Sequence, residues 1–314
     1  MSDASQPNAK GADASRASAN KGLVAGAAAF AIWGVFPLYF HALHQVSAFQ
    51  AIAHRIVWSC AFVLGWMLFR GELGSLRAAL TNRGVVLRLA ATATLITINW
   101  VAYVWGVMHG HVVETSLGYF IGPLVNVLLG VVLLSERLTP AQWTAVALAT
   151  LGVGYLTFMA GGVPWIALTL AFSFASYGLL RKVVKVESLP GLATETLLLT
   201  PFAVAYLLWC ESTGIGAFGH SGGIIDALLI GSGPITAITL FLFAYGTRLL
   251  PYSTVGLLQY IAPSLQFVCG VFVLHEPFDR ARSIGFALIW AALVIYAGEG
   301  VRLSRKQQAR VLTA

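Results

Sequence analysis

The stretch ETSLGYFIGPLVNVLLGVVLLSER, residues 114–137, decides the fold. It opens on a carboxylate, contains a Gly-Pro pair and then continues as aliphatic residues for longer than most soluble helices. An apolar run of about 20 residues is long enough to cross the hydrocarbon core of a bilayer. The stretch therefore predicts a membrane-spanning helix in which Glu114, Pro123 and Asn126 need an explanation.

The composition of the whole chain is also that of a membrane protein. Of its 314 residues, 58% are hydrophobic and only 10% are charged, whereas soluble domains are about 25% charged. So few charges cannot cover this much apolar surface in water, so we expect an integral membrane protein. The net charge of +7 does not indicate nucleic acid, because cytoplasmic loops of membrane proteins carry surplus Lys and Arg. Cys60, Cys210 and Cys269 lie far apart without metal-type spacing, and no cofactor or metal is expected.

Ten apolar runs are long enough to span a bilayer. They are residues 22–43, 48–69, 85–108, 112–135, 140–160, 162–180, 190–210, 223–247, 252–275 and 281–300. Because a backbone N–H finds no partner in lipid, each run must be helical, so the expected fold is all-α. Residues 1–21 and 301–314 are expected to be cytoplasmic tails, the first of them disordered.

The distribution of Lys and Arg orients these spans. With the N-terminus placed inside, 16 of the 19 Lys and Arg residues, Arg181 among them, fall in inner segments. The outer loops hold only Arg280 and Arg282, and Arg55 lies within a span. This asymmetry predicts a multi-pass protein of the cytoplasmic (inner) membrane with both termini in the cytoplasm.

The sequence matches itself at an offset of 140 residues. At this offset Pro123 falls on Pro263, and Glu136 falls on Glu276. We therefore expect two copies of a five-helix unit, residues 22–160 and 161–300. Because five is odd, the second copy enters the membrane from the opposite side, and inverted repeats of this kind are typical of secondary transporters.

Several stretches resemble a known family. They are HRIVWS (54–59), INWVAYVWGV (98–107), HVVETSLGYFIGPLVNVLLG (111–130), SERL (135–138), FASYGLLRK (174–182), ETLLLTP (195–201) and LQYIAPSLQF (258–267). Over residues 22–300 the chain resembles the drug/metabolite transporter superfamily, built from paired EamA domains, and its RarD subgroup, whose members carry the name chloramphenicol-sensitive protein. The subgroup usually reads Tyr-Phe-Ile-Asn-Pro where this chain reads YFIGP, so Gly122 replaces an asparagine. If the amide of that asparagine contacts substrate in relatives, the substrate of this chain differs from theirs.

Three of the charged residues within the predicted spans are candidates for a role in transport, because a charge at the bilayer centre costs at least about 2.5–3.5 kcal/mol. Glu114, about one turn into the fourth span, and Glu195, in the first turns of the seventh, are candidates for proton coupling or cation binding. Arg55 is a candidate to pair with a carboxylate or an anionic substrate, because Arg cannot lose its proton. The alternatives are a helix-terminal charge stabilised by the dipole for Glu114 and charges that only fix helix register for Arg55 and Glu195.

Polar residues on the third, fourth and ninth spans are candidates to contact a solute. They are Asn99, Tyr103, Tyr119, Gly122, Asn126, Gln259 and Gln266. Asn99 and Tyr103 share a helix face, and the alternative for them is an interhelical hydrogen bond and an aromatic belt. Pro123 and Pro263 each remove a backbone hydrogen bond. Paired kinks there are expected to line a wet cavity at the membrane midplane, unless the prolines only shape the bundle.

These features predict a secondary transporter that moves a small organic solute, such as a metabolite, an amino acid or a drug-like molecule, by alternating access. The resemblance favours export, and import stays open. Glu114 and Glu195 allow proton coupling, and uncoupled exchange fits the residues equally. No P-loop or H-E-x-x-H motif occurs, so an enzyme is not expected. An intramembrane enzyme and a non-transporting sensor are the alternatives. The expected partners are the solute, protons and lipid but no nucleic acid, for a monomer or homodimer.

Overall fold

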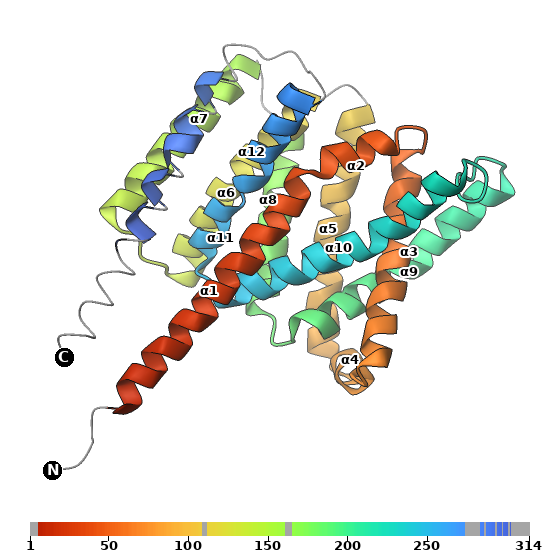
Figure 1. The fold of residues 1–314 in the computed structure, drawn as a ribbon, viewed down its shortest axis with the longest axis horizontal. Helices are drawn as coiled ribbons and strands as arrows, with labels where there is room; N and C mark the ends of the chain where they lie inside the picture. Colours follow the sequence, from red (N-terminus) through yellow and green to blue (C-terminus); the bar gives the residue numbers. More distant parts are fainter. Residues whose placement is uncertain are drawn as a thin grey trace.

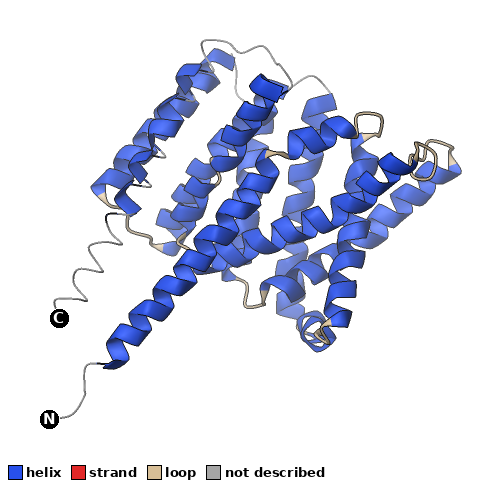
Figure 2. Ribbon diagram, viewed as in Figure 1, coloured by secondary structure: helices blue, strands red, loops and turns tan. Residues whose placement is uncertain are grey.

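The computed structural model describes residues 6–108, 112–160, 165–273 and, beyond these, 283–285, 287–292, 294–296, 298–300 and 302. These residues form helices joined by turns, with no strand among them (Figure 2). The helices are α1 (Gln6–Gly34), α2 (Phe36–Ala42), α3 (Ala48–Phe69), α4 (Leu73–Thr81), α5 (Arg83–Met108), α6 (Val112–Leu134), α7 (Pro140–Ala160), α8 (Trp165–Val183), α9 (Ser188–Ser212), α10 (Gly223–Leu249), α11 (Tyr252–Leu258), α12 (Ile261–Val268) and the π-helix η1 (Cys269–Val273).

Among the described residues, seven helical segments are long and apolar enough to cross a membrane. They are Ala17–Ala42, Ala48–Phe69, Arg83–Gly106, Trp165–Val183, Ser188–Ser212, Gly223–Leu249 and Ser283–Gly300. Gly118–Leu134 of α6 is a shorter apolar segment. The run expected at 140–160 is α7, and the run expected at 252–275 is divided among α11, α12 and η1. Part of the last expected run, 281–300, lies outside the described residues.

The N-terminal segment differs from its expectation. Residues 1–21 were expected to form a disordered tail, whereas α1 begins at Gln6 and continues into the first apolar run. Alanine is frequent in this segment and has the highest helix propensity of all residues. Pro7 falls in the first helical turn, where its missing N–H would have no helical partner. Residues 303–314 lie outside the described part of the chain.

Helices α3, α5, α8, α9 and α10 pack against one another on one side of the bundle (Figure 1). Helix α10 crosses the molecule and packs on α3, while α3 packs on α9, and α5 packs on α8. Gly233 of α10 makes the first of these contacts close, because a Cβ there would lie 2.6 Å from the backbone nitrogen of Ser59 on α3. The Ser59 hydroxyl also donates a hydrogen bond to the Gly233 carbonyl over 2.9 Å.

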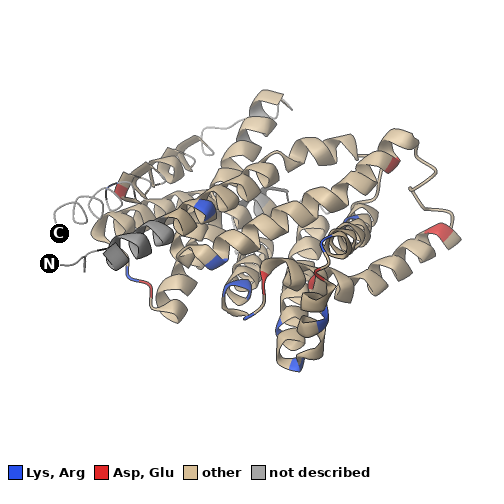
Figure 3. Ribbon diagram, turned by 60° about the horizontal axis from the view of Figure 1, so that its bottom comes forward, with Lys and Arg blue, Asp and Glu red and all other residues tan. Residues whose placement is uncertain are grey.

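Most charged side chains lie toward the helix ends, and the long middle stretches carry few (Figure 3). Two of these charges hold neighbouring helix ends. The Glu136 carboxylate, in the connection after α6, accepts hydrogen bonds from the N–H groups of Tyr252 and Ser253 at the start of α11, the latter over 2.9 Å. The Lys182 ammonium donates to the carbonyl of Thr247 over 3.0 Å at the end of α10, where a cation is favourable for the helix dipole.

Candidate functional site

Arg55 lies at the eighth residue of α3, and only 8% of its surface is exposed. Its Nε donates a hydrogen bond to Thr236 Oγ1 of α10 over 3.0 Å. Its guanidinium carbon lies 5.5 Å from the ring centres of Phe36 and Phe40 on α2 and 5.0 Å from that of Trp100 on α5. Cations in such positions are attracted to the faces of the rings. We call Phe36, Phe40 and Trp100 the aromatic cage of Arg55.

Three tyrosines also lie near this guanidinium. Tyr39 of α2, Tyr103 of α5 and Tyr119 of α6 are its electrostatic neighbours. The rings of Tyr103 and Tyr119 meet edge to face with their centres 5.9 Å apart. Within the described part of the chain, Arg55 forms no ion pair with a carboxylate.

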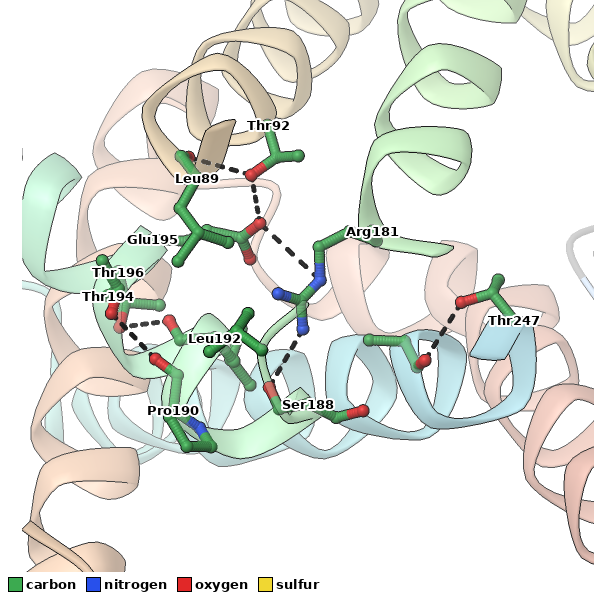
Figure 4. Close-up of polar contacts among 12 residues, drawn as sticks. Leu89, Thr92, Arg181, Ser188, Pro190, Leu192, Thr194, Glu195, Thr196 and Thr247 are labelled. Carbon is green, nitrogen blue, oxygen red and sulfur yellow. Dashed lines mark hydrogen bonds and ion pairs between the residues drawn. The ribbon is translucent and has the colours of Figure 1, made fainter. Parts of the chain in front are cut away.

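Glu195 lies at the eighth residue of α9 and is 3% exposed. Its carboxylate accepts a hydrogen bond from the Thr92 hydroxyl of α5 and another from the Tyr177 hydroxyl of α8. It also forms an ion pair with Arg181 of α8, whose Nε lies 3.7 Å away. Figure 4 shows the carboxylate of Glu195 between Thr92 and Arg181, with Ser188 accepting a hydrogen bond from the other side of the guanidinium. Glu195 is therefore held by donors from two neighbouring helices.

The position of Arg181 corrects the charge count made from the sequence. The count places Arg181 in an inner loop, whereas the structure buries it in the last turn of α8 with 2% of its surface exposed. Its Nη2 donates to the Ser188 carbonyl over 3.0 Å, while Nε and Nη1 have no hydrogen-bond partner among the described residues. The charge of Arg181 is therefore compensated chiefly by Glu195.

A small cavity of about 10 Å³ lies between the two charged sites, which is about the space that one water molecule needs. Glu195 and Tyr177 line it on one side. Trp100 and Thr236, which contact Arg55, line it on the other. The remaining lining residues are Ile56, Ser59, Ile96, Leu192, Thr196, Leu199 and Leu240. The cavity thus brings α3, α5, α8, α9 and α10 together around both charges.

A second polar cluster joins α6 to the break between α11 and α12. Asn126 is fully buried, and its Nδ2 donates to Gln259 Oε1 over 2.6 Å. Among the described residues, Asn126 Oδ1 has no donor. A Cβ on Gly122 would lie 2.7 Å from Gln259 Nε2, so the Gln259 amide occupies the space that a side chain at position 122 would need.

The comparisons with known proteins agree on one family. Residues 20–158 match the model of the EamA-like transporter family. An uncharacterized transporter of Pseudomonas aeruginosa is 43% identical over 293 residues, which cover 92% of this chain and 97% of the relative. Protein RarD of Streptomyces exfoliatus is also 43% identical, and the alignment covers 93% of each chain. The chain belongs to the RarD subgroup of the EamA transporters.

This EamA transporter is therefore a multi-pass membrane protein of the drug/metabolite transporter superfamily, as the resemblance in sequence predicts. A solved crystal structure, titled only as that of a protein, covers 90% of this chain and 99% of its own with a TM-score of 0.69. Because the two sequences are only 20% identical, this structural similarity shows a shared fold and nothing more.

The candidate residues of this EamA transporter fall into separate groups in space. Arg55, Tyr103 and Tyr119 gather around the aromatic cage, and Gly122, Asn126 and Gln259 meet at the helix break. Two others bond to neighbouring helices, as Asn99 donates to the Leu170 carbonyl over 2.9 Å and Gln266 donates to the Trp33 carbonyl over 3.3 Å. The side chain of Glu114 lies outside the described part of the chain.

The two matched prolines lie in different settings. Helix α6 continues through Pro123, whereas the ninth run breaks at Gln259–Tyr260, and Pro263 occupies the third position of the new helix α12. At that position its missing N–H leaves no helical hydrogen bond unmade. The two halves of this EamA transporter therefore differ where their prolines align.

Several residues that the sequence did not single out complete the site. Thr92, Tyr177 and Arg181 hold Glu195, while Phe36, Phe40 and Thr236 contact Arg55. A Thr within an apolar helix usually bonds to its own backbone, and Phe is the expected residue there, so neither type gave a signal. Trp100, on the third predicted span, completes the aromatic contacts of the same buried cation.

The close fit between Gly122 and Gln259 gives a prediction for this EamA transporter. The variant Gly122→Asn carries the amide expected from the family pattern, and it should displace the Gln259 side chain and break its hydrogen bond to Asn126. We expect a destabilisation of about 1–3 kcal/mol from overpacking, measured as a lower thermal unfolding midpoint in detergent.

The control for this variant is Gly154→Asn, because no atom lies within 4 Å of a Cβ at Gly154. Adding Gln259→Ser to Gly122→Asn should recover most of the lost stability. Equal midpoints for Gly122→Asn and Gly154→Asn contradict the proposed contact.

Proposed function

We propose that this protein is a secondary transporter that exports a small organic solute across the cytoplasmic membrane by alternating access, with proton coupling through Glu195. One observation carries the proposal. Eight of the residues that line the central cavity form four pairs separated by 140 positions, namely Ile56 with Thr196, Ser59 with Leu199, Ile96 with Thr236 and Trp100 with Leu240.

This pairing is what a pseudo-two-fold axis through the cavity produces. Helix α3 faces α9 and helix α5 faces α10 at matching positions, at the same offset that aligns Pro123 with Pro263 in the sequence. Carriers with inverted repeats bind substrate at the interface of the repeats, and rocking of one repeat against the other opens that interface to each side in turn. The cavity is the place in the described structure that such a motion would open.

Glu195 borders this axis and is our candidate for proton coupling. Its carboxylate has one cationic partner, Arg181, and two hydroxyl donors, Thr92 and Tyr177. Rearrangement of α9 against α5 and α8 would change these partners and hence the proton affinity of the carboxylate. Glu114 is the second candidate, by its place in α6 alone.

The test is flux in liposomes that contain the purified protein. A panel of amino acids, metabolites and amphipathic drugs is screened with and without an imposed pH gradient. We expect flux that follows the gradient in the wild type and that no longer responds to it in Glu195→Gln, which keeps an oxygen to accept from Thr92 but cannot exchange a proton. Glu211→Gln, on the same helix but exposed, is the control and should behave as the wild type.

Each outcome distinguishes the alternatives. Flux that ignores the gradient in the wild type removes proton coupling and leaves a uniporter or exchanger. If gradient-driven flux persists in Glu195→Gln, another group couples transport to protons, and Glu114→Gln is the next variant to measure. A protein that moves no solute in the panel contradicts transport and favours the enzyme or sensor alternative.

A further inference from the structure

We propose that Arg55 binds the carboxylate of the solute, and that the solute is a small monocarboxylate with an aromatic or apolar body. The inference rests on the proposed function, because it names the chemical class that the transporter carries. The observation behind it is a buried cation without a carboxylate partner among the described residues, whose neighbours Trp100 and Thr236 line the cavity between the two halves.

The donors of Arg55 are only partly used. Its Nε is bonded to Thr236, while Nη1 and Nη2 have no hydrogen-bond partner among the described residues. Arg55 therefore has donors that no described residue uses, and a planar guanidinium matches a carboxylate with two parallel hydrogen bonds.

The surroundings of Arg55 define the rest of the ligand. The aromatic cage offers apolar faces on α2 and α5, and ligand sites of this kind combine mostly apolar walls with a few polar groups that fix orientation. The hydroxyls of Tyr103 and Tyr119 are further donors near the guanidinium. An acid with an aromatic or aliphatic body would place its charge on Arg55 and its body against these rings.

The charge balance favours a monocarboxylate over a phosphate ester. Among the described residues, the electrostatic neighbours of Arg55 are three tyrosines and no second cation. One guanidinium compensates one negative charge, whereas a phosphate dianion would leave a second charge buried and unpaired, which is costly. Inorganic phosphate is therefore a suitable negative probe.

The two halves of the chain differ at this position in a way that supports an external anion. Arg55 and Glu195 occupy the same register in α3 and α9, separated by 140 residues. Glu195 has its cation inside the chain, in Arg181. Arg55 has no such counterpart among the described residues, so the missing negative charge is supplied by the solute.

The experiment compares matched acids and amides on detergent-purified protein by isothermal titration calorimetry. The probes are 3-phenylpropionate, indole-3-acetate and hexanoate, each beside its primary amide, together with inorganic phosphate. We expect at least one acid to bind the wild type roughly tenfold or more tightly than its amide, because hydrogen bonds to ionised groups are the strong ones. Phosphate should neither bind nor compete.

Variants assign this preference to Arg55. Arg55→Gln should bind acid and amide equally, and Arg55→Lys should keep part of the preference because it keeps the charge but loses the planar fork. Arg70→Gln, an exposed arginine directly after the same helix, should bind as the wild type. The acid–amide comparison on the wild type needs no variant, so poor folding of Arg55→Gln does not remove the test.

The results that overturn the inference are equally definite. Equal affinities for acid and amide, no binding of any acid, binding of phosphate in preference to the acids, or an acid preference that survives in Arg55→Gln each contradict it. Binding is measured without a membrane, so it is separate from flux. Transport of neutral solutes alone would contradict this inference but not the proposed function. Acid binding without flux of any solute would contradict the proposed function but not the binding of an acid at Arg55.

Discussion

Replacing Glu195 with alanine is expected to destabilise the protein by about 3–5 kcal/mol, because the change leaves the buried charge of Arg181 without compensation. Both side chains are almost fully enclosed, at 3% and 2% exposure, so bulk solvent compensates the remaining charge only weakly. The Tyr177 hydroxyl would lose its carboxylate acceptor in the same change, and the Thr92 hydroxyl would keep only the Leu89 carbonyl. The measurement is thermal and urea-induced unfolding of the protein in detergent micelles, followed by circular dichroism.

A double variant separates the charge from the packing. Arg181→Met combined with Glu195→Leu removes both charges while filling their space, and apolar replacements of buried ion pairs are often neutral or stabilising. We expect this double variant to be clearly more stable than Glu195→Ala alone. If Glu195→Ala unfolds at the same midpoint as the wild type, the ion pair does not compensate Arg181 as described.

The second large effect is expected from Gly233→Ala, which should destabilise the protein by about 1–3 kcal/mol and weaken the function of Arg55. The added Cβ would overlap the Cβ and the carbonyl carbon of Trp58, so α10 must move away from α3. Thr236 lies about one turn further along α10, and its hydrogen bond to Arg55 should lengthen or break. Unfolding in detergent and solute flux in liposomes measure the two effects.

Gly65→Ala is the matched control, because Gly65 lies in α3 and a Cβ there would meet no atom within 4 Å. Removing a glycine from a helix without a clash is expected to stabilise it slightly. A Gly233→Ala protein as stable and as active as Gly65→Ala would show that α3 and α10 can separate without cost, contrary to the packing described.

The apolar runs predicted the helices well, because a segment in lipid has no alternative to the helix that satisfies its backbone. The ninth run shows where this reasoning ends. Pro263 marked the run as interrupted, but the break lies at Gln259–Tyr260, and α11, α12 and η1 follow one another where one helix was expected. The local geometry there depends on α6, whose Asn126 bonds to Gln259, and a sequence alone does not reveal that contact.

The sequence predicted the two charged residues of the site but not the residues that contact them. Arg55 and Glu195 stood out because charges within apolar runs are rare. The offset of 140 related their positions, and the structure places Glu195 with Arg181 instead. Arg181 next to Lys182 has the appearance of a loop segment, so its burial could be recognised only from the packing of α8 against α5 and the ion pair of Arg181 with Glu195 of α9. Thr236 and the aromatic cage carried no distinguishing pattern at all.

The hydrogen bond between Arg55 and Thr236 has a consequence for how the chain is made. The two residues are separated by 181 positions, and synthesis at about 5–20 residues per second makes that an interval of roughly 9–36 s. The hydrogen bond from Ser59 to Gly233 likewise joins residues 174 positions apart, and the one from Asn126 to Gln259 joins residues 133 positions apart. During that time the Nε of Arg55 lacks the hydrogen-bond partner that Thr236 later provides. The helices of the first half are therefore synthesised early, but their hydrogen bonds to α10 and Gln259 form only after the second half has been synthesised.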